Sequence, residues 1–433
     1  MKGLSFVRKG ALLASFLSLN ALACPPSPEA SLSLASAVQL AWCNHPSSGL
    51  ASARIDAARA ATAVASAAQK PVVTANAGVS RSYQLAPTQD ITDQHSAGIS
   101  ASWVITDFGV TRHRTESARN AETSAQQAAE DVRSALALST ARAWLDLALA
   151  QHQLVLRKQT AKELDVVLAA ALAQYENGVV TRVDVYQAKA AFEQSRYLMA
   201  QAEAQAKHKA RALSALTGFL PEELAPLASE ESLHLENVAL LTSLEQVSTL
   251  KSRVPLLQAT EATLMARRHA VEAARVAHSP VITGNLTRQW NQRETASSGS
   301  WSAGVTLNIP LYSGGLKTAQ LKEALAQEEI ARQQKAEALL TWESGLISAK
   351  ENLALSEHAL LAAQASFDAA FASHALAQGR YAAGVGAVLD VHAAVSQKEQ
   401  AGFSLLQARV SRVEQALHVR HLENTLVEHL QNN

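Results

Sequence analysis

The chain has 433 residues with 38 basic and 38 acidic side chains, so it carries no net charge while its histidines are neutral. This balance excludes proteins that bind nucleic acid through a broad basic surface. Alanine is abundant, aromatic residues make up only 5%, and glycine and proline are few. Such a composition is typical of long helices that pack closely, and we therefore expect a mainly α-helical protein.

The first residues predict a signal peptide over 1–23. Basic side chains at positions 2, 8 and 9 precede a short apolar run, and Ala21-Leu22-Ala23 fits an A-x-A cleavage site. The run is shorter than the roughly 20 apolar residues that a membrane-spanning helix needs. We therefore expect the chain to be exported.

Export would place both cysteines, Cys24 and Cys43, in an oxidising compartment. A disulfide between them would tie the mature N-terminus to the first helix. Lipidation of Cys24, directly after the cleavage site, is the alternative, although Ala21 stands where lipoprotein signals usually carry leucine. The sequence favours the disulfide and leaves lipidation open.

The chain contains an internal repeat of long period. Three landmarks recur in the same order at nearly constant spacing, namely Lys70-Pro71-Val72 with Ser279-Pro280-Val281, Tyr175-Glu176-Asn177-Gly178 with Tyr381-Ala382-Ala383-Gly384, and Asp184-Val185 with Asp390-Val391. We therefore expect a first repeat over 24–220, a connector over 221–243 and a second repeat over 244–428. Each repeat should run helix, two strands, very long helix, glycine turn and second long helix.

Four segments alternate apolar and polar residues with period two: 72–85, 95–107, 281–291 and 300–311. In the last, Trp301, Ala303, Val305 and Leu307 alternate with small polar residues. Alternation predicts strands with one apolar face, which either a soluble sandwich or a membrane barrel could use. Lengths near ten residues and the serine, threonine and asparagine of the other face favour strands that span a membrane around a water-filled lumen.

The polar loops over 84–94 and 292–299 should face outside the cell. Four strands cannot span a membrane alone, because open sheet edges are not tolerated in lipid. Three chains would supply twelve strands and close a barrel.

Residues 109–176 contain no proline and no internal glycine, which predicts one very long helix. Its apolar residues form two coiled-coil rows about 200° apart: Leu138, Leu145, Leu149 and Leu156, and Leu136, Ala143, Leu147 and Leu154. We therefore expect neighbours on two opposite sides. The second half carries a strict seven-residue row at Leu339, Leu346, Leu353, Leu360 and Phe367.

The mature chain has duplicated strand pairs inside long helices and two Tyr-x-x-Gly turns, each followed by an Asp-Val pair. In these features it resembles the TolC family of outer-membrane efflux and secretion proteins. The resemblance implies a mainly α fold with a small β part: a homotrimer with a 12-stranded transmembrane β-barrel on a long periplasmic α-helical barrel. It also implies the outer membrane of a Gram-negative bacterium, contact with outer-membrane lipid, and a periplasmic adaptor (membrane fusion protein) linking the duct to an inner-membrane ABC or RND-type pump.

The resemblance assigns two groups of residues at the periplasmic tip. Asp184, Asp390, Tyr175, Tyr381 and Arg182 correspond to the gate, where the acids would form carboxylate rings in the trimer; a simpler interpretation of each acid is a solvated carboxylate at a helix N-terminus. The adaptor-docking turns contain Gly178, Val179, Thr181, Gly384, Val385 and Gly386. The chain departs from the prototype at Gly386, which replaces a gating arginine, and at Ala393, which replaces a second acid.

No motif for catalysis, nucleotide binding or metal binding occurs, so we expect no enzyme activity and no cofactor. His418 and His421 lie one turn apart, which we interpret as part of a solvated helical face. The sequence predicts a passive exit duct and leaves its cargo, protein or small molecule, open. A secreted soluble coiled-coil scaffold without a pore is the alternative.

Overall fold

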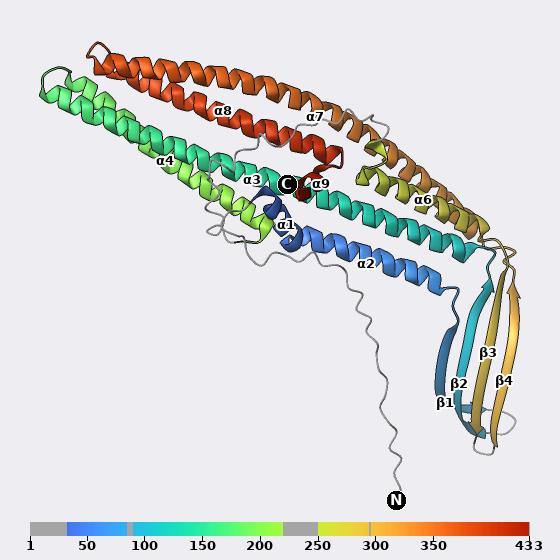
Figure 1. The fold of residues 1–433 in the computed structure, drawn as a ribbon. Coiled ribbons are helices and arrows are strands. Elements are labelled where there is room, and N and C mark those ends of the chain that lie inside the picture. The colour runs from blue at the N-terminus through green and yellow to red at the C-terminus, as the bar shows by residue number, and fades with distance from the viewer. Residues whose placement is uncertain (1–32, 85–89, 220–249, 294–295, 433) are drawn as a thin grey trace, which may run out of the picture.

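The computed structural model of the chain describes residues 33–84, 90–219, 250–293 and 296–432. Long helices form an elongated body, and a four-stranded sheet leaves one end of it at an angle (Figure 1). The predicted signal peptide, Cys24 and the connector lie outside the described residues. Cys43, in the first helix, is not a free thiol, and its pairing with Cys24 stays a prediction.

The same order of elements occurs in both halves. The first half consists of α1 (Leu34–Asn44), α2 (Pro46–Ala67), β1 (Val72–Gln84), β2 (Asp90–Thr106), α3 (Val110–Glu176) and α4 (Arg182–Thr217). The second consists of α6 (Pro255–Val276), β3 (Val281–Arg293), β4 (Ala296–Asn308), α7 (Leu316–Ala382), α8 (Val388–Leu422) and the short α9 (Leu426–Asn432). Helices α3 and α7 have 67 residues each, and the predicted duplication of the fold is confirmed.

The strands form one antiparallel sheet in the order β1-β2-β3-β4, so the hairpins of the two halves join at β2 and β3. Three strand boundaries differ from expectation by three residues or more, and one of them is the start of β4, at Ala296 rather than 300. Strand β2 begins at Asp90 rather than near 95, because its polar residues still pair with β1, as in the ion pair of Arg81 with Asp93. Strand β4 ends at Asn308 rather than 311, since Pro310 has no N–H to donate to a ladder.

The register confirms that one face of the sheet is apolar and the opposite face is polar. Cross-strand partners lie on the same face, and the pairs Ile282 with Leu307 and Leu286 with Ala303 make one face apolar. Val305 is 70% and Leu307 56% exposed within the chain. No helix among the described residues lies over the sheet in Figure 1, so these residues provide no dry core for the apolar face.

Helix α3 lies between α4 and α8 in the helical body. Leu145 and Leu147, one from each predicted row, are both buried. They belong to one cluster with Leu213 of α4 and Val413 and Leu417 of α8. The two rows therefore have neighbours on two sides, as predicted, and the central helix joins the two halves of the chain.

Helix α7 has one buried side and one open side. From its predicted row, Leu346 and Leu353 are buried, and Leu353 packs with residues of α8. On other sides of the helix, Leu340 is 67%, Ile347 60% and Leu361 69% exposed. These three side chains are also spaced by multiples of seven, so α7 carries a second coiled-coil row that the described residues leave uncovered.

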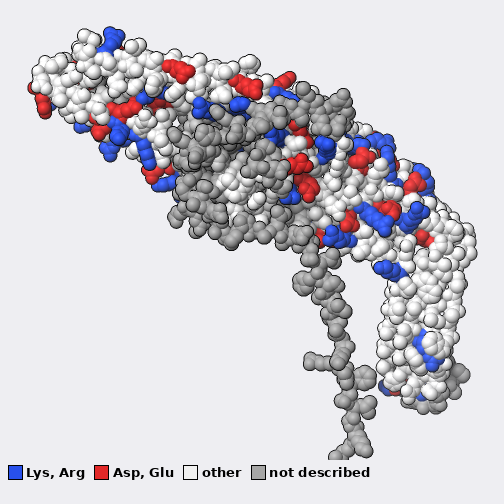
Figure 2. Space-filling model, in the orientation of Figure 1, with Lys and Arg blue, Asp and Glu red and all other residues white. Residues whose placement is uncertain are grey.

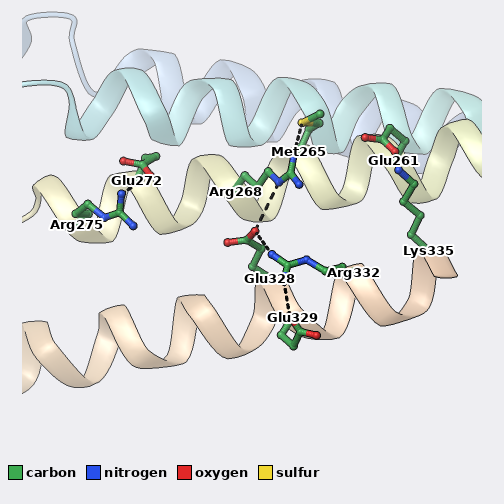
Figure 3. Close-up of polar contacts among 9 residues, drawn as sticks. All are labelled: Glu261, Met265, Arg268, Glu272, Arg275, Glu328, Glu329, Arg332 and Lys335. Atoms are coloured by element: carbon green, nitrogen blue, oxygen red, sulfur yellow. Dashed lines mark hydrogen bonds and ion pairs between the residues drawn. The ribbon is translucent and has the colours of Figure 1, made fainter. Parts of the chain in front are cut away.

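Ion pairs set the orientation of α6 against α7 (Figure 3). Glu328 of α7 accepts from Arg332 of the same helix at 3.0 Å and faces Arg268 of α6 at 3.5 Å. Lys335 pairs with Glu261 one to two turns further along. Exposed pairs are worth about 0–1 kcal/mol each, so they align the helices more than they stabilise them. Figure 2 shows charged side chains spread along the helices and few on the sheet.

The expectation of a solvated face is wrong for His421 at the end of α8. Its Nδ1 lies 2.7 Å from the hydroxyl of Ser134 on α3. Burial lowers the pKa of the His421 imidazole to about 4, with smaller contributions from His418 and Arg142. The ring is therefore neutral in the folded protein at neutral pH and links the two halves through a hydrogen bond.

We expect His421 to make the protein less stable in acid. Because the unfolded imidazole binds protons near pH 6.5 and the folded one near 4, the stability that neutral His421 contributes is complete above about pH 6.5 and is lost as the pH falls toward 4. Lowering the pH from 7.5 to 4.5 should reduce the unfolding free energy of the wild type. The reduction for His421→Gln should be smaller, by on the order of 2 kcal/mol. Urea unfolding at both pH values measures this difference. His208→Gln, an exposed control on α4, should follow the wild type.

Candidate functional site

The candidate site lies at the end of the helical body farthest from the sheet, where two turns join α3 to α4 and α7 to α8 (Figure 1). Gly178 and Gly384 have left-handed φ angles of 71° and 74°, a conformation that favours glycine. The amides of Gly178 and Gly384 donate to the carbonyls of Tyr175 and Tyr381 at 3.0 Å. The two predicted turns therefore end their helices in the same way.

Each turn presents an apolar side chain to solvent. Val179 is 65% and Val385 70% exposed, while their amides are held by hydrogen bonds to Gln174 and Arg380. The backbone is thus fixed while the side chain is free. A fixed, exposed apolar tip suits a contact with another protein.

Asp184 caps the helix that follows the first turn. Its Oδ2 accepts hydrogen bonds from the Thr181 amide at 2.8 Å and the Thr181 hydroxyl at 2.7 Å. These bonds, the hydroxyl first, lower the pKa of the Asp184 carboxyl. The carboxylate therefore stays charged at the tip and has a structural role beside any role in a pore.

The second turn has no such cap. Ala387 stands at the position of Thr181, and Asp390 is exposed. Asp390 lines a shallow groove of about 430 Å³ between α7 and α8, together with Arg380 and Gly386. The two predicted gate acids thus occupy different environments: Asp184 is tied to its own turn, and Asp390 faces an open polar groove.

The two gate tyrosines also differ. Tyr175 is 42% exposed, whereas Tyr381 is 7% exposed and packs with Leu164 of α3, Ala188 of α4 and Val391 of α8. Burial, and then the charge of Asp184, raise the pKa of the Tyr381 hydroxyl, which has no hydrogen-bond partner among the described residues. Tyr381 therefore joins the two halves at the tip, and Tyr175 remains available to another chain.

Arg182 lies over the ring of another tyrosine, Tyr186. Its guanidinium carbon lies 5.6 Å from the ring centre of Tyr186 on the same helix. Within the described part of the chain it forms no ion pair. Tyr186, which is 57% exposed, was not predicted from the sequence as its partner.

The second turn has no room for a side chain at Gly386. A Cβ there would lie 2.9 Å from the Tyr381 amide nitrogen and 3.1 Å from the Arg380 carbonyl carbon. These are backbone atoms that cannot rotate away. This backbone therefore excludes the arginine that the prototype carries at the same position.

We expect Gly386→Ala to destabilise the tip by about 1–3 kcal/mol, the usual cost of overpacking. Gly379→Ala is the matched control, because Gly379 lies inside α7, where an added Cβ would meet no atom within 4 Å, and this variant should gain about 0.5–1 kcal/mol in helix propensity. Hydrogen exchange of the amides at 383–388 would measure both. Equal protection in the two variants would contradict the expectation.

A partly buried network of charges along the helices was not predicted from the sequence. Lys398 of α8 donates to both oxygens of Glu163 on α3 at 2.9 and 2.7 Å, and His374 of α7 lies 3.7 Å from Glu163. Arg157 pairs with Glu399 at 2.8 Å. These residues are scattered over three helices, so no sequence motif identifies the network.

The described residues contain no group of three or more histidine, cysteine, aspartate or glutamate side chains that could hold a metal ion. The same part of the chain has no helix that is both long and apolar enough to cross a membrane.

Solved structures identify the class of fold. A membrane protein from Pseudomonas aeruginosa superposes with a TM-score of 0.83 at 22% identity, covering 90% of this chain and 92% of that one. The outer-membrane channel MtrE of Neisseria gonorrhoeae, in its open state, gives 0.78 at 20% identity, with 91% and 89% covered. CusC gives 0.81 at 20% identity, with 92% and 93% covered. The fold is that of outer-membrane channels.

The model of the outer membrane efflux protein family matches residues 37–219 and 247–424, and the chain belongs to this family. CyaE of Bordetella pertussis is 29% identical over 85% of this chain and 79% of its own length. The probable efflux pump outer membrane protein TtgC of Pseudomonas putida is 28% identical over 68% of this chain. That alignment spans only 62% of TtgC. The protein resides in the outer membrane and extends into the periplasm.

Proposed function

We propose that the protein is a passive exit duct of a tripartite efflux or type I secretion system. The single observation that carries this proposal is the sheet, whose apolar face is exposed at Ile99, Trp103, Val305 and Leu307 and whose opposite face carries small polar residues. In an outer membrane, the apolar face would contact lipid and the polar face would line a water-filled lumen.

A single chain leaves this sheet with two open edges, at β1 and β4. Unpaired edges are not tolerated in lipid, so pairing β4 of one copy with β1 of the next would close the barrel. The exposed row of Leu340, Ile347 and Leu361 on α7 would be covered by the same neighbour. Both features support a homotrimer with twelve strands.

At the tip, each of Asp184 and Asp390 would become a ring of three carboxylates. Such rings favour cations in a pore. The exposed turns with Val179 and Val385 would dock onto the tips of a periplasmic adaptor, which would connect the duct to an inner-membrane ABC or RND-type pump. The pump would supply the energy and select the cargo, protein or small molecule.

Conductance across planar lipid bilayers tests the duct. We expect the purified full-length protein to form channels that prefer potassium over chloride, and Asp184→Asn combined with Asp390→Asn to lower this preference severalfold. Asp56→Asn, which changes an exposed acid on α2 far from the tip, should leave it unchanged. A protein that forms no channels and washes off membranes with salt would instead be the soluble coiled-coil scaffold.

Crosslinking in cells tests the docking turns. A photoreactive amino acid at Val385 should crosslink to a periplasmic adaptor, whereas one at Leu361 within α7, which is equally exposed in the single chain, should crosslink to a second copy of the duct. Adaptor crosslinks from Leu361 alone would refute tip docking.

A further inference from the structure

Arg288 lies on the apolar face of the sheet, the face that also carries Arg81 on β1. Arg288 pairs across the strands with Ile99 on one side and with Trp301 on the other, and cross-strand partners share a face. Its neighbours along β3 on that face are Leu286 and Trp290. An arginine in contact with lipid is costly at the middle of a membrane and much less so near its surface.

Two tryptophans and a glycine hold the Arg288 side chain. Its guanidinium carbon lies 4.8 Å from the ring centre of Trp290 and 5.0 Å from that of Trp301. A Cβ added at Gly299 would lie 3.0 Å from the Arg288 Nη2, so the guanidinium occupies the space that the missing side chain leaves. Cation–π contacts with both rings restrain a charged side chain that would otherwise be free to move.

The side chain points toward the outer end of the sheet. Gly299 pairs with Trp290, and both lie closer than Arg288 to the hairpin that joins β3 to β4. Because the helices extend into the periplasm, this hairpin end faces the cell exterior. Long basic side chains reach toward the membrane surface in this way, and tryptophans gather at the same level.

The charge of Arg288 is not neutralised by the protein. Arg288 forms no ion pair and donates no side-chain hydrogen bond within the parts of the chain that the structure describes. The contrast is Arg81 on β1, whose Nε and Nη2 each donate to Asp93 at 2.6 Å. Arg293 on the opposite face of β3 donates to Gln94 at 3.2 Å. Only Arg288 combines a fixed position, a lipid-facing surface and an unpaired charge among these three.

We propose that Arg288, Trp290, Trp301 and Gly299 form a binding site for the phosphate group of a lipid in the outer leaflet of the outer membrane. The guanidinium offers several N–H donors in a plane, a geometry that matches phosphate oxygens. The two indoles would contact the acyl chains or sugar of the same lipid. This proposal depends on the location of the sheet in the outer membrane. It does not depend on the cargo or the partners of the duct.

Native mass spectrometry of the full-length protein in detergent tests the site, with the bisphosphorylated glucosamine-based glycolipid of Gram-negative outer leaflets as probe. We expect Arg288→Gln to bind this lipid about tenfold more weakly than the wild type, and Arg293→Gln, the matched control, to bind it equally well. The wild type should bind the dephosphorylated lipid as weakly as Arg288→Gln binds the intact one. Millimolar inorganic phosphate should not displace the lipid.

Equal binding by Arg288→Gln and the wild type, or equal binding of the two lipids by the wild type, would overturn the proposal. Displacement by inorganic phosphate would reveal a site for free anions and would also overturn it. Trp301→Leu keeps the charge and removes one ring, so a severalfold loss is expected even if Arg288→Gln assembles poorly. Channel conductance should persist in all three variants, which separates this test from that of the duct.

Discussion

Ala303→Arg is expected to prevent most of the protein from assembling in the outer membrane. Ala303 lies near the middle of β4 and pairs with Leu286 on the apolar face. An arginine on the lipid side of a barrel costs about 2–4 kcal/mol at the membrane midplane. In a trimer this cost would arise three times in one barrel. Outer-membrane fractionation and the yield of folded oligomer measure the effect.

The adjacent residue is the control. Ser302 pairs with Thr287 on the opposite face, so Ser302→Arg should point into the lumen, where water can solvate it. We expect this variant to assemble like the wild type and to alter conductance instead. If Ser302→Arg blocked assembly and Ala303→Arg did not, the assignment of the two faces would be reversed.

Lys398→Met is expected to destabilise the helical body by about 3 kcal/mol. The Lys398 side chain is 11% exposed, and its removal would leave the Glu163 carboxylate, 28% exposed, with the more distant His374 and the neutral side-chain amide of Gln159, which donates to it at 3.3 Å. Loss of one partner of a buried ion pair typically costs about 3–5 kcal/mol, and the partial exposure of Glu163 places this case at the lower end. Urea unfolding at neutral pH would measure the difference.

Two further variants separate charge from packing. Lys398→Met with Glu163→Leu removes both charges and should recover most of the stability, because an apolar pair of similar volume needs no charged partner. Lys207→Met breaks the exposed pair with Glu203, whose side chains are 67% and 52% exposed, and should cost no more than about 1 kcal/mol. If the double variant were as unstable as Lys398→Met, lost packing would explain the effect instead.

The network suggests how the tip and the body of the duct are joined. Glu163 and Arg157 belong to the first half of the chain, and Lys398, Glu399 and His374 belong to the second. Tyr381 makes a second junction nearer the tip, through apolar contacts. A motion that separates α3 from α8 would have to break both junctions.

The sequence by itself determined the repeat, the strands and the long helices. Period-two alternation in Trp301–Leu307 and the seven-residue row from Leu339 to Phe367 depend only on local geometry, since each pattern specifies which side of an element is apolar. The glycines of the two turns were predictable for the same reason. Left-handed φ angles at Gly178 and Gly384 are a local requirement that few other residues meet.

Only the tertiary structure decided how the two repeats within the chain differ. The burial of Tyr381 against the exposure of Tyr175, the neutral His421 beside Ser134 and the pairing of Lys398 with Glu163 all depend on contacts between residues far apart in the chain. Burial and electrostatic shifts follow from such contacts and leave no periodic signal in the sequence. Gly386 shows the same limit, because the absence of space for a side chain appears only when the backbone of the turn is in place.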